Sequence, residues 1–265
     1  MKFKILSLAL VVNALSGIAI ADTVTTPAPS STTASKSTYD WTGVYVGGFV
    51  GGATGSDVSN TASRESDGSL WNDPGDANNN YSTKAGFIGG GTVGYNWQIG
   101  KTPYLVGLEG EYGYLGQKGG KTDPNAALNN TYYGDDDNSQ SSTTIGADYG
   151  YGLVGGRLGY ALDRSLIYIK SGAVFTTVNS SWSDTAYGIN GTSNKATTTG
   201  YALGAGFEYA LPFKYFTNVS LKTEYLYFGI PTSATLLTRF SDEDIANTQT
   251  TSGIHTAKIG VNYKF

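Results

Sequence analysis

The sequence predicts an all-β protein: an eight-stranded antiparallel transmembrane β-barrel with short periplasmic turns and four long extracellular loops. Three observations support this prediction. The chain begins with a secretion signal, eight later segments alternate between apolar and polar residues, and the connections between them alternate between short and long. Bacterial outer-membrane barrels have an even number of strands, short periplasmic turns, long outer loops and alternating apolar and polar residues along each strand.

The signal occupies residues 1–21. Two lysines near the start precede an apolar run that ends on Ala19-Ile20-Ala21, an A-x-A cleavage pattern, so cleavage is expected before Asp22. A transmembrane anchor is the alternative, but the apolar run is short and Asn13 and Ser16 interrupt it. Residues 22–40 are rich in Thr, Ser, Ala and Pro and show no periodicity. We expect a disordered periplasmic spacer there, followed by the barrel over residues 41–265.

The composition agrees with a secreted membrane barrel. Charged residues make up only 14% of the chain, whereas a soluble domain has roughly 25%, and the 37 glycines are about twice the usual share. The absence of cysteine rules out a disulfide framework and lipoprotein processing. An excess of 21 acidic over 17 basic side chains argues against a nucleic-acid partner. A secreted soluble β-sandwich remains the alternative fold.

The eight expected strands follow one another from residue 41 to the end of the chain. They are Trp41–Ala53, Ala85–Gln98, Tyr104–Leu115, Tyr149–Leu162, Leu166–Val178, Gly200–Leu211, Asn218–Phe228 and Gly253–Phe265. The first is so rich in glycine that its faces cannot be assigned. In the others, aromatic and aliphatic residues share one face, expected to meet lipid. In chain order this face includes Val93, Trp97, Leu108, Tyr112, Val154, Leu158, Ile167, Ile169, Leu203, Phe207, Leu221, Tyr225, Ile259 and Val261.

The opposite face carries charged residues in the middle of the strands. A lysine or arginine on the lipid face costs roughly 2–4 kcal/mol, so these side chains are expected inside. The interior set is Glu109, Glu111, Arg157, Lys170, Glu208, Lys222, Glu224, Lys258 and Lys264. Because side chains fill the interior of so small a barrel, we expect a hydrogen-bonded charge plug with at most a narrow, low-conductance pore. Tyrosines near the strand ends, Tyr45 and Tyr225 among them, are expected in the interfacial girdles.

The connections set the topology. Those at residues 100–103, 163–164 and 212–217 are short, and those at residues 56–83, 117–144, 179–199 and 229–252 are long and polar. Both termini then lie on the periplasmic side. The acidic runs Asp135-Asp136-Asp137 and Asp242-Glu243-Asp244 fall in outer loops, where they could bridge Ca²⁺ to lipopolysaccharide. Their spacing is not that of an EF-hand, so we expect solvated loops and no metal site.

Several motifs resemble one known family in order and spacing. They are Trp41–Gly48, Gly94–Gln98, Gly156–Tyr160, Gly204–Tyr209, Glu224–Tyr227 and His255–Phe265. As a set they resemble the OmpA-like eight-stranded outer-membrane β-barrel family. More narrowly, they resemble the porin-like surface antigens of alphaproteobacteria, some of which bind hemin. Gly155 departs from the pattern, because relatives often carry a second basic residue there.

The resemblance implies a location and partners. The location is the cell outer membrane of a Gram-negative bacterium, with lipid and lipopolysaccharide around the barrel and the loops outside. Tyr263 and Phe265 match the carboxy-terminal signature that the barrel-assembly machinery reads in this family. The implied function is that of a structural surface protein and antigen. The alternative is a surface protein that binds hemin, or an adhesin that binds host surface molecules, through its extracellular loops.

His255 is the single histidine of the chain. It is a candidate axial ligand of heme iron, although tyrosines could serve instead. The interpretation that we prefer is a residue at the outer rim of the last strand. An outer-membrane acyl hydrolase would need His255 as its base. Its strand parity points it toward lipid, and no G-x-S-x-G motif is present. We therefore expect no enzymatic activity and no resident cofactor.

Overall fold

The computed structural model describes residues 39–55, 57–64, 81–123, 141–184, 189–230, 232–240 and 243–265. The expected signal peptide and nearly all of the expected spacer lie outside these ranges, as does the acidic run at 135–137. Within the described ranges, no helix is long and apolar enough to cross a membrane.

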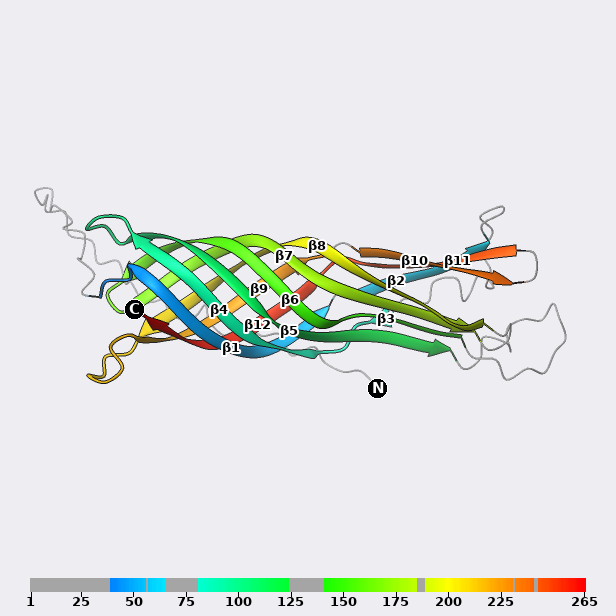
Figure 1. The fold of residues 1–265 in the computed structure, drawn as a ribbon, viewed down its shortest axis with the longest axis horizontal. Helices are drawn as coiled ribbons and strands as arrows, with labels where there is room; N and C mark the ends of the chain where they lie inside the picture. The colour runs from blue at the N-terminus through cyan, green and yellow to red at the C-terminus, as the bar shows by residue number, and fades with distance from the viewer. Residues whose placement is uncertain are drawn as a thin grey trace, which may run out of the picture. The chain divides into compact units, whose positions relative to one another are not determined.

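The main body is a closed antiparallel barrel, which confirms the predicted fold class (Figure 1). Its strands are β1 (Gly43–Gly55), β4 (Gly86–Gln98), β5 (Tyr104–Asp123), β6 (Ser141–Leu162), β7 (Ser165–Asp184), β8 (Ile189–Ala210), β9 (Val219–Gly229) and β12 (Ile254–Lys264). Their order around the barrel is β1-β12-β9-β8-β7-β6-β5-β4. The first and last strands close the barrel, in a register that runs from Tyr45 opposite Lys264 to Gly55 opposite Ile254.

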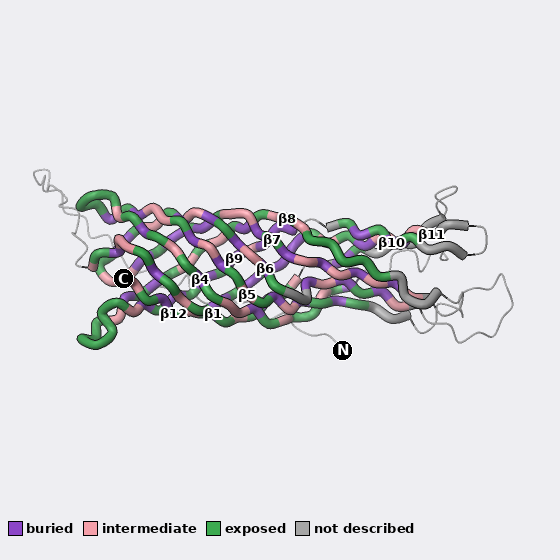
Figure 2. The backbone as a smooth tube through the Cα atoms, viewed as in Figure 1, coloured by how far each residue is buried: buried purple, intermediate pink, exposed green. Residues whose placement is uncertain are grey.

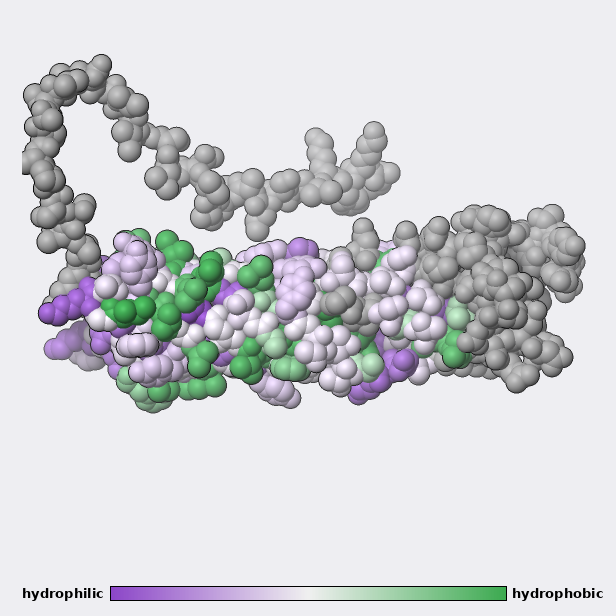
Figure 3. Space-filling view, turned by 90° about the horizontal axis from the view of Figure 1, so that it is seen from above, coloured by the Kyte–Doolittle hydropathy of each residue, from purple (hydrophilic) through white to green (hydrophobic). Residues whose placement is uncertain are grey.

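Side chains alternate between the barrel interior and its outer surface, as the period of two predicts (Figure 2). In β12, His255, Ile259 and Val261 are exposed, whereas Thr256 and Lys258 are buried. Figure 3 shows hydrophobic residues, in green, gathered on the outer surface of the barrel. An outer surface of this kind is suited to the hydrocarbon of a bilayer.

The structure assigns the faces of the first strand, which the sequence left open. Tyr45 and Phe49 are buried inside the barrel, and Val44, Val46 and Val50 are exposed on its outer surface. The expectation that Tyr45 belongs to an interfacial girdle is therefore wrong. Its partner in the neighbouring strand is Gly94, and a Cβ atom there would meet the Tyr45 ring, so the missing side chain makes room for that ring.

The long connections contain additional β-structure instead of plain loops. The strands β5, β6, β7 and β8 run well past the predicted barrel segments. The short strands β2 (Asp57–Arg64), β3 (Tyr81–Ser82), β10 (Thr232–Phe240) and β11 (Glu243–Thr251) form a second sheet in the order β10-β11-β2-β3. Of these, β10 and β11 are rich in threonine, whose β-branched side chain favours strands. Their polar character concealed them as strands, because β-structure outside the membrane needs no apolar band.

This extension has its own buried residues. Val58, Tyr81, Ile145 and Val178 form an apolar cluster between the second sheet and the extended parts of β6 and β7. Gln249 of β11 is fully buried; it donates to the Ser181 carbonyl oxygen at 3.2 Å and accepts from the Tyr81 hydroxyl at 2.9 Å. The described parts of the long connections thus pack against one another.

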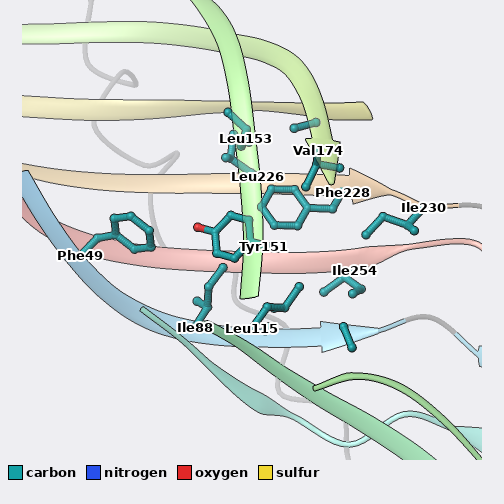
Figure 4. Close-up of a cluster of buried hydrophobic side chains, with 13 residues drawn as sticks. Phe49, Ile88, Leu115, Tyr151, Leu153, Val174, Leu226, Phe228, Ile230 and Ile254 are labelled. Carbon is teal, nitrogen blue, oxygen red and sulfur yellow. The ribbon is translucent and has the colours of Figure 1, made fainter. Parts of the chain in front are cut away.

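The barrel interior is layered. At the end with the short turns, Trp41 packs with a small apolar group, and its indole nitrogen donates to the Asp163 carbonyl oxygen at 3.2 Å. A larger apolar layer lies toward the extension (Figure 4). Its members are Phe49, Ala53, Ile88, Leu115, Ala147, Tyr151, Leu153, Val174, Ala202, Leu226, Phe228, Ile230 and Ile254. The charged residues lie between these two layers along the strands, so apolar side chains close the interior on both sides of them.

Candidate functional site

The middle of the barrel holds a cluster of buried charged side chains, which we call the ion cluster. Its members are Glu109 and Glu111 on β5, Arg157 on β6, Lys170 on β7, Glu208 on β8, Lys222 and Glu224 on β9, and Lys258 on β12. Each is 4% exposed or less. Each points inward because alternate residues of a strand face the lumen, and each of these residues is at an inward position of its strand.

Two lysines from different strands hold the centre of the ion cluster. The Lys170 ammonium donates to Glu109 and Glu111 and lies 3.5 Å from a Glu224 oxygen. The Lys258 ammonium lies 2.8 Å from Glu111 and 2.7 Å from Glu224. These contacts cross the lumen, because Glu111 and Lys258 come from strands that are not neighbours in the barrel.

Arg157 organises a second group nearer the short turns. Its Nε donates to Asn96 Oδ1 at 2.8 Å, and its Nη1 lies 3.2 Å from Glu208 and 3.6 Å from Glu109. Glu208 also accepts from Ser220 and from Asn262. The guanidinium lies 4.5 Å from the centre of the Tyr45 ring, a distance at which a cation–π contact adds to the ion pairs.

Three tyrosines that the sequence did not assign to the cluster complete it. Tyr45 donates to Glu109 at 2.5 Å, Tyr151 donates to Glu111 at 2.9 Å, and Tyr168 donates to Glu224 at 2.9 Å. The alternation along the strands could have identified Tyr151 and Tyr168, which are in phase with the inward residues Arg157 and Lys170 of their own strands. The glycine-rich strand of Tyr45 gave no such indication. The glycines opposite two of these tyrosines are a second indication. Gly206 lies opposite Tyr168, as Gly94 lies opposite Tyr45, and a Cβ atom at Gly206 would meet the Tyr168 ring.

Lys264 does not belong to the ion cluster, which corrects the expectation from parity. It is only half-buried, its ammonium donates to the Asp40 carbonyl oxygen, and it lies 4.7 Å from the centre of the Tyr39 ring. Lys264 ends β12, so its side chain meets the residues that lead into β1 instead of the mid-barrel carboxylates. Without Lys264 the described cluster contains four carboxylates and four cations, and its formal charge is zero.

The carboxylates do not form an open cation site. Oxygens of Glu109, Glu111 and Glu224 lie within 4.8 Å of one another, a spacing that could suit a metal ion. Lys170 contacts all three carboxylates, and Lys258 contacts two of them. The lysine ammonium groups therefore fill the positions that a metal ion would need.

Two members of the ion cluster have a nitrogen without a hydrogen-bond partner in the described structure, Arg157 at Nη2 and Lys222 at its ammonium. Lys222 lies 3.6 Å from Glu109, but its ammonium has no hydrogen-bond partner in the described structure. The ring of Phe49 lies 5.9 Å away. Lys222 therefore helps to neutralise the charge of Glu109 without donating a hydrogen bond to it.

The other residues singled out from the sequence lie on the outer surface. Tyr263 and Phe265 are exposed, with ring centres 5.2 Å apart, and the Phe265 amide donates to the Val44 carbonyl oxygen at 3.0 Å. His255 is also exposed. Its Nδ1 lies 2.6 Å from the Tyr225 hydroxyl, and its ring centre is 5.0 Å from that of Tyr227. These groups face away from the lumen.

The arrangement is suited to closing the barrel and not to conducting through it. Each buried charge contacts at least one opposite charge, and removing one partner of a buried pair typically costs about 3–5 kcal/mol. An ion crossing the lumen would have to separate these pairs and pass two apolar layers.

We expect Lys258→Met to lower the free energy of unfolding by about 3–5 kcal/mol, because Glu111 and Glu224 would lose a buried partner. The matched control is Lys264→Met, which removes the same charge at the rim and should cost about 0–1 kcal/mol. Urea unfolding of the refolded protein in detergent micelles, followed by tryptophan fluorescence, gives both values.

A double variant tests the balance of charge. Lys258→Met/Glu224→Gln restores neutrality and should be more stable than Lys258→Met alone. Equal, small losses for Lys258→Met and Lys264→Met would contradict the central place of Lys258. In planar bilayers the unaltered protein should show small conductance steps at most, and large stable steps would contradict the closed interior.

Comparison with known proteins assigns the chain to a family. The outer membrane protein beta-barrel domain matches residues 23–265. The 31 kDa outer-membrane immunogenic proteins of Brucella melitensis biotype 1 and Brucella suis biovar 1 are each 30% identical over 254 residues, covering 92% of this chain and 92% of the relative.

Solved structures of small outer-membrane proteins are also similar. The outer membrane protein OprG of Pseudomonas aeruginosa has a TM-score of 0.47 and 15% identity, covering 84% of this chain and 96% of OprG. Neisserial surface protein A has a TM-score of 0.36 and 16% identity, covering 84% of this chain and 97% of that protein. From the family match and the Brucella relatives, this chain belongs to the outer membrane protein β-barrel family and resides in the outer membrane of a Gram-negative bacterium.

Proposed function

We propose that this protein is a structural surface protein and antigen, in which a closed barrel anchors a folded extracellular extension. The observation that carries the proposal is the balanced ion cluster, enclosed between two apolar layers inside the barrel. Such an interior favours anchorage over transport and leaves at most a narrow, low-conductance pore. Function then belongs to the part of the chain outside the membrane.

The extension supports this assignment. Its sheets are held by the buried groups around Tyr81 and Gln249, so it presents a defined surface. The stretch Ser193–Thr197 of β8 is exposed at every residue and consists of polar and small side chains. A polar surface of this kind is suited to lipopolysaccharide or to polar host surface molecules as partners. The description of the Brucella relatives as immunogenic also favours an antigen.

Labelling of single cysteines on intact cells tests the display of the extension. The chain has no cysteine, so one introduced thiol is a unique site. Thr197→Cys in β8 should react with a membrane-impermeant maleimide on living cells, because that position lies in the extension and is exposed. Lys101→Cys in the short turn after β4 should react only after the cells are opened.

Both variants should keep the shift in gel mobility on boiling that marks a folded barrel. Labelling of Lys101→Cys on intact cells, with Thr197→Cys protected, would mean that the orientation is reversed. Equal labelling of both would mean that the barrel does not separate the two sides.

We further propose that Tyr263 and Phe265 form the signal that the barrel-assembly machinery binds. Phe265 is 71% exposed at the very end of the chain and faces outward, where a partner can reach it. Deletion of Phe265 should leave export intact but reduce the amount of folded protein in the outer membrane. The control is Tyr112→Ala, which removes an exposed aromatic ring far from the terminus. Fractionated cells with unchanged outer-membrane amounts after the deletion would reject the signal.

A second candidate function is hemin binding, favoured by the surroundings of His255. The Tyr225 hydroxyl is hydrogen-bonded to Nδ1 of His255, so Nε2 remains for an iron atom. The ring of Tyr227 packs against the His255 ring. If the site is real, titrated hemin should give a saturable Soret shift that is lost in His255→Ala and kept in Tyr112→Ala. Non-saturable adsorption that both variants share equally would remove this candidate.

A further inference from the structure

The connection between β8 and β9, residues 211–218, exposes three aromatic side chains at the end of the barrel that carries the carboxy terminus. Tyr215 is 87% exposed, and Phe213 and Phe216 are each more than half exposed. The other short turns at this end differ. The turn Asp163-Arg164 has no apolar residue, and in the turn after β4 the exposed large apolar residue is Ile99. Figure 1 shows the β8–β9 connection, in gold, extending beyond the strands that it joins.

Hydrogen bonds fix the shape of this connection. The Leu211 amide donates to the Val219 carbonyl oxygen at 2.9 Å, and the Phe216 amide donates to the Phe213 carbonyl oxygen at 2.8 Å. From the neighbouring turn, Arg164 Nη1 donates to the Leu211 carbonyl oxygen at 3.0 Å. The three rings are therefore held outward by an ordered turn, and their exposure is part of the fold.

The exposed rings continue the lipid-facing surface of the barrel. Tyr209 and Leu221, which lie opposite each other on β8 and β9, are exposed on the outer face directly before and after the turn. On the adjacent strand β12, Tyr263 is exposed at the same end. Aromatic rings prefer the boundary between headgroups and acyl chains, and a lysine beside them can contact phosphate. Lys214 lies between Phe213 and Tyr215 and is exposed.

We propose that the β8–β9 turn is a membrane anchor that inserts into the periplasmic leaflet of the outer membrane. Phe213, Tyr215 and Phe216 enter the headgroup boundary of the phospholipids, and the Lys214 ammonium contacts their phosphates. The continuity with the lipid-facing strands favours lipid over other occupants. The Thr-, Ser- and Pro-rich segment 22–38 offers few apolar groups that could cover three aromatic rings.

Depth-dependent fluorescence quenching tests this anchor on the full mature chain. Lys214→Cys and Lys101→Cys each place one unique thiol, and therefore one fluorophore, in a short turn at this end. In vesicles of phosphatidylethanolamine and phosphatidylglycerol, a quencher attached to the lipid should act about threefold more strongly on the Lys214 probe than on the Lys101 probe. Iodide in the aqueous phase should show the opposite order.

Two further variants carry the same Lys214 probe. Phe213→Ser/Tyr215→Ser/Phe216→Ser should reduce lipid quenching to the level of the Lys101 probe. Tyr215→Ser alone removes only the most exposed ring, so it keeps the test valid if the triple variant does not fold. The anchor is overturned if both probes are equally accessible to iodide, or if quenching at Lys214 depends on protein concentration, which would indicate contact with a second copy.

Discussion

Buried ammonium groups inside a membrane barrel are stable only where carboxylates surround them, and Lys170 and Lys258 meet this condition by sharing Glu111 and Glu224. This shared pairing is the constraint on which the rest of the barrel depends. It requires strands far apart around the barrel to reach one register, because β5, β7, β9 and β12 must place their charges at one level. Tyr45, Tyr151 and Tyr168 each add a hydrogen bond to one of the carboxylates that the cations contact.

The layers around the cluster strengthen its pairing. Apolar side chains on both sides exclude water and lower the local dielectric, so that each ion pair is stronger and each unpaired charge more costly. The same layers support the proposed closure of the lumen. In that proposal the stability of the barrel and its closure to ions have one physical origin.

Those external surfaces differ at the two ends. One end continues into a folded two-sheet extension with buried groups such as Gln249, and the other carries short turns, of which the β8–β9 turn exposes aromatic rings. The polar surface at one end and the exposed aromatic turn at the other therefore suit different surroundings. The rigid interior holds both surfaces in place.

The sequence by itself determined the barrel strands, the faces of seven of them and the location, because lipid outside and a filled lumen inside force a period of two on each of these strands. It also identified all eight charged residues of the ion cluster from the alternation along the strands. Only the tertiary structure decided which of them meet, since contacts across a lumen depend on the stagger of the closed sheet. It removed Lys264, which ends its strand at the rim, and brought in Tyr45, whose glycine-rich strand has no readable faces. It also turned polar connections into a second sheet, because strands that lie in water carry no apolar band to reveal them.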